Sequence, residues 1–258
     1  MDYKDGTVGL GTGGVDLNVP AGFYFLSAQD ARRVIVEAWR NPPKAAEHVL
    51  GMVMPAAKTP LDDAWGAVIT YDDDGYVSDE DAASVDYTSL LNEMQQATAE
   101  SSKERVKQGF PSIRLVGWAQ PPFYDRTTHK LHWAKELEFG GSAQHMVNYD
   151  VRALGRRGVL NINFVASMDQ FDEIKGAIPA VMAMPQFESG SRYQDYVPGV
   201  DKVAAYGIGG LVAGKLLAKA GVLAIVLAFA KKAWILLFVA LGGLWRFVAR
   251  LFRRAPAA

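Results

Sequence analysis

The sequence predicts an α+β domain, an antiparallel β-meander with two or three covering helices, followed by a C-terminal membrane helix region. Two observations lead to this prediction. Between residues 112 and 164 four segments alternate apolar with polar residues, as strands that bury one face do. From residue 203 to residue 249 the chain is almost entirely apolar, and the few charges within it are basic.

Short strands and two helices are expected in the N-terminal half. Short apolar segments between glycine- or proline-containing turns predict strands at residues 7–10, 15–19, 23–26, 48–54 and 65–71. Ser27 is a suitable N-cap for a helix at 28–39. The polar stretch 86–108 has an apolar stripe and predicts a second helix, which Gly109 ends.

The meander follows. Its strands are predicted at residues 112–120, 129–139, 147–151 and 160–164. Pro121 and Pro122 are expected to end the first strand, and Lys135 interrupts the alternation of the second. A third helix is predicted at 168–183, with Ser167 as its cap and a kink at Pro179.

Charge divides the chain. Residues 201–258 hold nine basic residues and one acid, which leaves 18 basic and 27 acidic residues in 1–200. We therefore expect residues 1–200 to form an acidic soluble domain that does not bind nucleic acid, because binding to phosphates requires positive surface on the folded part. The chain has no cysteine, which excludes disulfides, cysteine zinc sites and thiol nucleophiles.

The tail predicts a membrane anchor. Residues 233–249 would span about 25 Å as a helix, close to the roughly 30 Å of a hydrocarbon core. Tryptophans and basic residues near its ends are typical of membrane interfaces: Trp234, Trp245, Lys231, Lys232, Arg250, Arg253 and Arg254. We expect an interfacial or semi-inserted helix at 201–230, and a transmembrane helix with a basic cytoplasmic tail at 231–258. A two-span hairpin with Lys231 and Lys232 at its tip is the alternative.

The basic residues also predict the topology. The arginines after the span outnumber the two lysines before it, so the C-terminus is expected in the cytoplasm. With one span, the acidic domain would lie outside the cytoplasmic membrane. Because the segment after Met1 lacks signal-peptide features, this topology predicts a signal peptide upstream. The hairpin alternative keeps the domain in the cytoplasm.

An ordered set of short motifs resembles a known family. The motifs lie at residues 71–82, 117–125, 129–134, 148–152, 154–158 and 201–207 (YDDDGYVSDEDA, GWAQPPFYD, HKLHWA, NYDVR, LGRRG and DKVAAYG). Together they resemble the bacterial membrane-anchored proteins catalogued as domain of unknown function 2167, sometimes labelled predicted regulator of amylopullulanase. The resemblance covers nearly the whole chain. It implies an exported N-terminal domain and a C-terminal anchor, and it assigns no catalytic residue.

A candidate ligand or partner surface surrounds the first meander hairpin. Rigid aromatic and proline side chains that are exposed can anchor a partner or stack on sugars. The candidates are Trp118, Pro121, Pro122, Phe123, Tyr124, Asp125 and Trp133, with Asn148, Tyr149, Arg152 and Arg156 on neighbouring strands. The alternative is that these side chains form core and a stiff turn.

Other residues suggest chemistry only weakly. The acidic loop (residues 72–81) has carboxylates suited to calcium, but we favour a turn in which Ser78 or Asp79 caps the next helix. The four histidines are expected to be solvated. No metal or other cofactor is expected.

The function favoured by the sequence is a non-catalytic interaction or regulatory module of the bacterial envelope. Its expected partners are the lipid bilayer and another membrane or envelope protein. The alternative is an envelope carbohydrate hydrolase that uses Asp125 and Glu136 as paired carboxylates.

Overall fold

The computed structural model describes residues 1–214, and Met1–Ala213 form one compact unit. Within these residues no helix is long and apolar enough to cross a membrane. The predicted span, its flanking residues (Trp234, Trp245, Lys231, Lys232, Arg250, Arg253 and Arg254) and most of the predicted helix at 201–230 lie outside the described residues. Residues 201–213 lie inside the compact unit.

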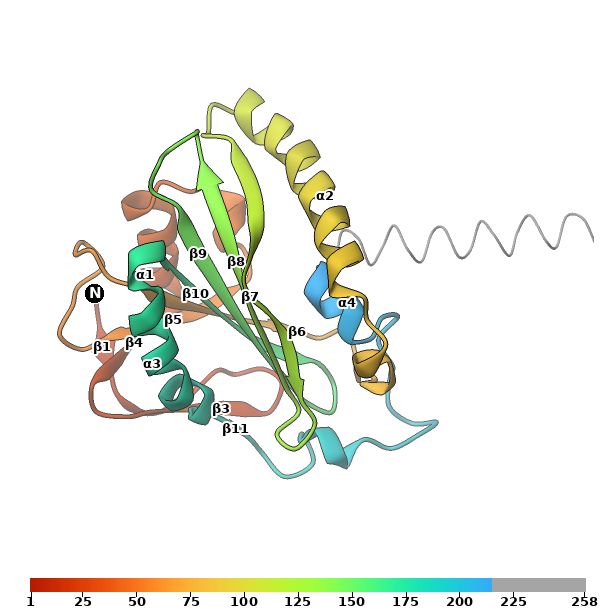
Figure 1. The fold of residues 1–258 in the computed structure, drawn as a ribbon. Helices are drawn as coiled ribbons and strands as arrows, with labels where there is room; N and C mark the ends of the chain where they lie inside the picture. The colour runs from red at the N-terminus through yellow and green to blue at the C-terminus, as the bar shows by residue number, and fades with distance from the viewer. Residues whose placement is uncertain (215–258) are drawn as a thin grey trace, which may run out of the picture. The chain divides into compact units, whose positions relative to one another are not determined.

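An eight-stranded antiparallel sheet forms the centre of the unit (Figure 1). Its order is β1-β4-β5-β6-β10-β9-β8-β7, with bounds Tyr3–Lys4, Phe23–Ser27, Val49–Pro55, Gly66–Asp72, Val159–Ser167, Met146–Leu154, Lys130–Phe139 and Ile113–Asp125. The consecutive strands β7 to β10 are neighbours in this order, so the predicted meander is confirmed. A three-stranded sheet contains β11, β3 and β2 (Pro185–Phe187, Val15–Val19 and Gly6–Gly9).

Strand register assigns side chains to the two faces of the large sheet, because directly opposed residues share a face. One row across the sheet is apolar and buried: Phe25, Val53, Ala67, Phe164, Tyr149 and Ala134. The next row, on the opposite face, begins apolar and becomes polar: Leu26, Met52, Val68, Asn163, Asp150 and Trp133. The first row marks the core face, and the second marks what we call the polar face.

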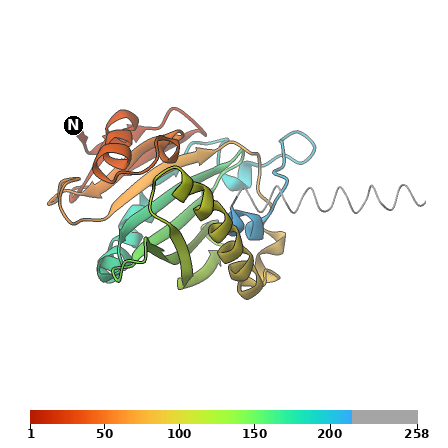
Figure 2. The same cartoon turned by 90° about the horizontal axis from the view of Figure 1, so that it is seen from above.

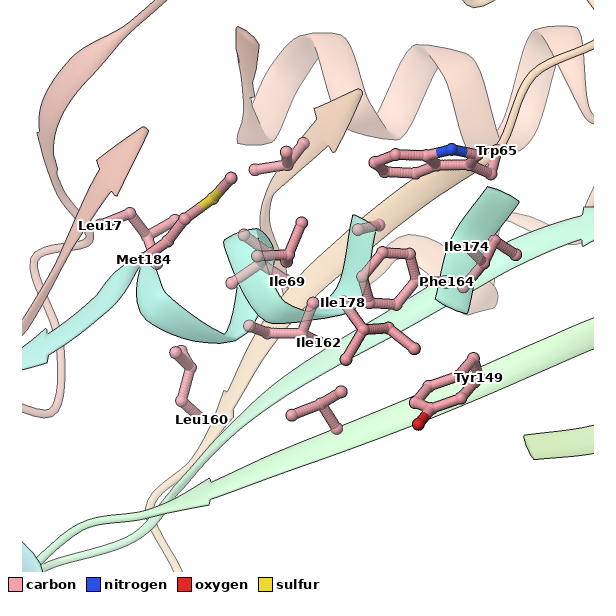
Figure 3. Packing of buried hydrophobic residues seen from close by; sticks show 14 of the residues in the cluster. Leu17, Trp65, Ile69, Tyr149, Leu160, Ile162, Phe164, Ile174, Ile178 and Met184 are labelled. Carbon is pink, nitrogen blue, oxygen red and sulfur yellow. The ribbon is translucent and has the colours of Figure 1, made fainter. Parts of the chain in front are cut away.

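Helix α3 (Phe171–Ala183) and the small sheet pack on the core face. Ile174 and Ile178 of this helix are buried with Phe164 and Tyr149 (Figure 3). Trp65 lies beside Phe164 with ring centroids 5.3 Å apart, and its indole Nε1 donates to Glu173 of α3 at 3.1 Å. Burial of this apolar surface is the main stabilising contribution to the fold.

The polar face is covered at its edges. The α-helix α1 (Ala28–Arg33) continues as the π-helical turn η1 (Val34–Ala38), and both contribute to a cluster with Leu26 and Met52. Figure 2 shows α1 and α3 on opposite sides of the sheet. Helix α2 (Tyr87–Lys107) packs along β7, where Gln95 donates to two backbone carbonyls.

The remaining elements are short. Single 3₁₀ turns and one short helix make up the rest: η2 (Pro43–Ala46), η3 (Glu80–Ala83), η4 (Met168–Gln170), η5 (Tyr193–Asp195) and α4 (Ile208–Ala213). One predicted cap is confirmed, since the side chain of Ser27 accepts from the amide of Asp30. Asp86, the first residue of the predicted helix at 86–108, is the N-cap of α2.

Two predictions were wrong, one about the end of strand β7 and one about the start of helix α3. Strand β7 does not stop before the prolines but continues through Pro121 and Pro122 to Asp125, with shifts of register on the way. It is an edge strand, so a missing N–H can face away from β8 without breaking the ladder. Ser167 makes no capping hydrogen bond and its hydroxyl is buried, because a 3₁₀ turn precedes α3.

Candidate functional site

The candidate surface residues do not form one surface but lie in three separate parts of the structure. Trp133 and Arg152 lie on the polar face, whereas Tyr149 lies on the core face. Tyr124 and Arg156 lie near the turns between strands, where they contact the acidic loop and the C-terminal part of the unit. Of the first hairpin, Pro121 and Phe123 are exposed, Trp118 is half-buried, and Pro122 is buried; Asn148 on β9 is half-buried.

A charged cluster lies at the centre of the polar face. The carboxylate of Asp150 is 2.9 Å from Lys135 Nζ and 2.9 Å from Arg152 Nη2, and it accepts from Asn163 at 2.9 Å. The Asp150 side chain is 3% exposed, while Lys135 and Arg152 are 22% and 17% exposed. Lys135, which interrupts the sequence alternation, is therefore the counter-ion of a buried acid.

The surroundings of Asp150 keep it ionised. Burial raises the pKa of this carboxyl, but the positive charges of Lys135 and Arg152 outweigh burial and hold the pKa below its usual range. The Arg152 guanidinium lies 5.0 Å from the ring centre of Trp133. Trp133 Nε1 and Asn161 Oδ1 are buried on the same face without a hydrogen-bond partner. This cluster therefore has one unused donor and one unused acceptor.

A second polar group lies at the edge of the core face. Tyr149 OH is 2.6 Å from His132 Nδ1, and Gln120 Nε2 is 3.2 Å from each of them. Burial lowers the pKa of His132 and raises the pKa of Tyr149 to about 12, so the protonated phenol donates to a neutral imidazole. His132 was expected to be solvated; the structure instead shows it half-buried and hydrogen-bonded.

A tyrosine cluster lies at the β7–β8 turn. Tyr76 stacks on Tyr193 and Tyr196 with ring centroids 4.6 and 3.8 Å apart, and Tyr193 stacks on His129 at 4.1 Å. Tyr124 OH donates to Asp79 at 2.9 Å and lies 3.2 Å from His129 Nδ1. Burial, together with the Asp79 charge, raises the pKa of Tyr124, which therefore stays protonated.

The acidic loop holds the last part of the unit, which we call the C-terminal segment (residues 196–213). Tyr206 OH donates to Asp74 at 2.7 Å. Asp81 accepts from the amides of Ile208 and Gly209 at 2.8 and 3.0 Å, and so caps α4. The loop carboxylates thus bind hydroxyl and amide groups of the chain itself. Within residues 1–214 no group of three His, Asp or Glu side chains is arranged to hold a metal ion.

Backbone contacts also attach the C-terminal segment to the acidic loop. Tyr76 pairs with Val203 in a parallel bridge, and its amide donates to the carbonyl of Lys202 at 2.8 Å. Gly75 has φ +107°, and a Cβ there would lie 2.6 Å from that same carbonyl oxygen, so the close approach requires glycine. The cap predicted at Ser78 or Asp79 was wrong, because Asp86 caps α2 and Asp79 makes no capping hydrogen bond at η3; Ser78 Oγ accepts from the amide of Glu80 at 3.3 Å.

The two carboxylates of the hydrolase alternative are far apart. Asp125 pairs with Lys130, and Glu136 lies six residues further along β8, about 20 Å at the rise of a strand. Paired glycosidase carboxylates are about 5–9.5 Å apart. Asp125 instead accepts from Thr127 and Thr128 in its own turn, and Glu136 bonds His145.

Sequence reasoning missed several of these residues. Asp150 is central to the charged cluster. In the sequence it stood only within the motif at residues 148–152, from which Tyr149 and Arg152 were selected as candidates and Asp150 was not. Tyr193, Tyr196 and Tyr206 gave no signal, because each contacts Tyr76 or Asp74, more than 100 residues away in the chain. The charged break at Lys135 was a usable signal, since a cation inside an alternating strand predicts a buried acid opposite it.

These features define an α+β sheet domain whose C-terminal segment is held by an acidic loop up to the start of the apolar tail. The chain belongs to the family described as "Protein of unknown function (DUF2167)", whose model matches residues 2–242. No curated protein matches the chain.

Two solved structures are similar at a low level. One is the solution structure of cyanobacterial PsbP (CyanoP) from Synechocystis sp. PCC 6803, with TM-score 0.38, 11% identity, and coverage of 72% of this chain and 92% of that chain. The other is a point mutant of the protein Mog1, with TM-score 0.34, 12% identity, and coverage of 72% of this chain and 96% of that chain.

Proposed function

We propose that this protein is a membrane-anchored, non-catalytic binding module of the bacterial envelope. The observation that carries the proposal is the attachment of the C-terminal segment to the sheet domain through Asp74, Asp81 and Tyr76. This attachment includes the first residues of the apolar run at 203–249. The apolar run therefore starts from a fixed point of the domain.

The separation of Asp125 from Glu136 supports a binding role over the hydrolase. The larger polar clusters of the described residues are also occupied by internal partners, as expected of structural networks. We place the domain outside the cytoplasmic membrane, with the basic C-terminus inside, following the positive-inside rule. The two-span hairpin with a cytoplasmic domain is the competing topology.

Two measurements test anchoring and topology. The full chain is expected in the membrane fraction after cell lysis and should resist extraction with alkaline carbonate; recovery in the supernatant would refute anchoring. Because the chain has no cysteine, a Leu61→Cys variant carries a single reporter at a side chain that is 86% exposed. A membrane-impermeant maleimide should label it in intact spheroplasts, whereas labelling only after lysis would favour the hairpin.

For the partner surface we propose the exposed part of the first hairpin. Phe123 is 58% exposed and lies over His132 with ring centroids 5.3 Å apart, beside exposed Pro121. A photo-reactive amino acid at position 123 should give a discrete adduct in native membranes. The same group at position 61 is the matched control, and identical adducts at both positions would count against a specific surface.

A further inference from the structure

A short exposed apolar loop lies in the C-terminal segment. Eight large hydrophobic residues are exposed in the described part of the chain, and three of them lie within residues 197–203. Val197, Val200 and Val203 are 41%, 75% and 50% exposed, and Pro198 and Gly199 between them are also exposed. We call residues 197–203 the valine loop. Grouped apolar side chains on a surface indicate an interaction site, whereas single ones do not.

Hydrogen bonds within the valine loop and to Arg156 fix its conformation. The Asp201 carboxylate accepts from the amide of Val197 at 2.7 Å and from Arg156 at 2.7 and 2.9 Å. The amides of Val200 and Asp201 donate back to the carbonyl of Val197 at 3.2 and 3.0 Å. Tyr196, just before the loop, is stacked on Tyr76. The turn is therefore fixed with its valines outward, although nothing in the described domain covers them.

Exposed charges of both signs lie around the valine loop. Its own acid, Asp201, is paired with Arg156, so the loop has no free negative charge. Lys202, Arg157 and Arg192 nearby are exposed. Exposed acids lie there too: Asp73 and Glu80 of the acidic loop, and Glu188. Aliphatic side chains with exposed lysine and arginine beside them are typical of segments that lie in the interface of a bilayer.

The position of the valine loop in the chain identifies the membrane as its occupant. Val203 precedes α4 by five residues, and the apolar run of the sequence continues from α4 to residue 249. We propose that the valine loop inserts into the headgroup region of the bilayer that the tail enters, as a second membrane contact. This inference rests on the proposed anchoring. It adds that the anchored domain is also held by its own surface, which restricts its rotation on the membrane.

The test uses the full chain with one added cysteine. Val200→Cys is labelled with the environment-sensitive dye NBD, and Leu61→Cys, at a similarly exposed apolar residue, is the matched control. Both proteins are reconstituted in liposomes of phosphatidylethanolamine and phosphatidylglycerol. The dye at position 200 should emit at shorter wavelength, with several-fold higher intensity, and be quenched by lipids spin-labelled near the headgroup. The dye at position 61 should behave as in water.

Each other outcome overturns the inference in a distinguishable way. If the protein floats with the liposomes but the dye at position 200 reports water, the valine loop is not inserted and anchoring stands. If neither variant floats with liposomes, the proposed anchoring itself fails. If the blue shift depends on the protein-to-lipid ratio and spin-labelled lipids do not quench it, the loop contacts a second copy of the chain instead.

Discussion

Replacing Asp150 by asparagine should destabilise the domain by about 3 kcal/mol. The carboxylate holds two cations and an amide at 2.9 Å each, and its side chain is 3% exposed. Removing one partner of a buried ion pair costs about 3–5 kcal/mol. The lower end applies because Lys135 and Arg152 are partly exposed and can regain some hydration in the variant.

The assay is equilibrium urea unfolding of the full chain in mild detergent, followed by tryptophan fluorescence. Asp73→Asn, at an exposed acid, is the matched control and should change the free energy of unfolding by less than about 0.5 kcal/mol. Lys135→Met, alone and with Asp150→Asn, completes a double-mutant cycle. The coupling free energy between the two sites should be about 1–3 kcal/mol.

The pH dependence gives an independent check. The pKa of Asp150 is lower in the folded protein than in the unfolded chain, where an Asp pKa is about 3.9. Its contribution is therefore fully present above that value and is lost as pH falls through the lower folded-state pKa. The stability difference between wild type and Asp150→Asn should shrink below about pH 4. A variant as stable as wild type at pH 7, or a difference that grows on acidification, would refute the reasoning.

Four further substitutions probe other parts of the structure. Asp81→Ala removes the acceptor of two α4 amides, a cap worth about 1–2 kcal/mol, so hydrogen exchange at those amides should be about 5–30-fold faster; unchanged exchange would contradict the attachment. Gly158→Ala places a Cβ 2.1 Å from the carbonyl oxygen of Asp72, and we expect a loss of about 1–3 kcal/mol in thermal unfolding. Phe123→Ser should alter stability by under about 0.5 kcal/mol, whereas Trp133→Ala, at a side chain 1% exposed, should cost about 3–5 kcal/mol; similar losses would contradict the assigned exposures.

Local patterns predicted most of the fold. Alternation in β8, β9 and β10 identified three neighbouring strands, because a half-buried sheet imposes a period of two on the sequence. Ser27 predicted the start of α1, because the cap depends on residues within the same turn. The strand end predicted at Pro121 and Pro122 was wrong. Whether a proline ends a strand depends on whether the strand has hydrogen-bonded neighbours on both sides, and this follows from the order of strands in the whole sheet.

The contacts of the candidate site could not be predicted in the same way. The acidic loop was considered for calcium or a helix cap, and its actual partners include Tyr206, Ile208 and Gly209, which follow it by more than 120 residues. No periodicity in one segment encodes such a pairing. Lys135 is the exception, because its charge breaks a local pattern and so indicates a partner on the next strand.

The attachment of the C-terminal segment has a consequence for biosynthesis. Asp81 and Ile208 are 127 residues apart, so the ribosome must finish almost the whole polypeptide before that contact can form. Until then Tyr76 and the loop after β6 lack their stacking and backbone partners. The nascent chain would thus complete its globular part only as the final hydrophobic stretch is being made. Under the proposed anchoring, this last folding event coincides with the insertion of that stretch.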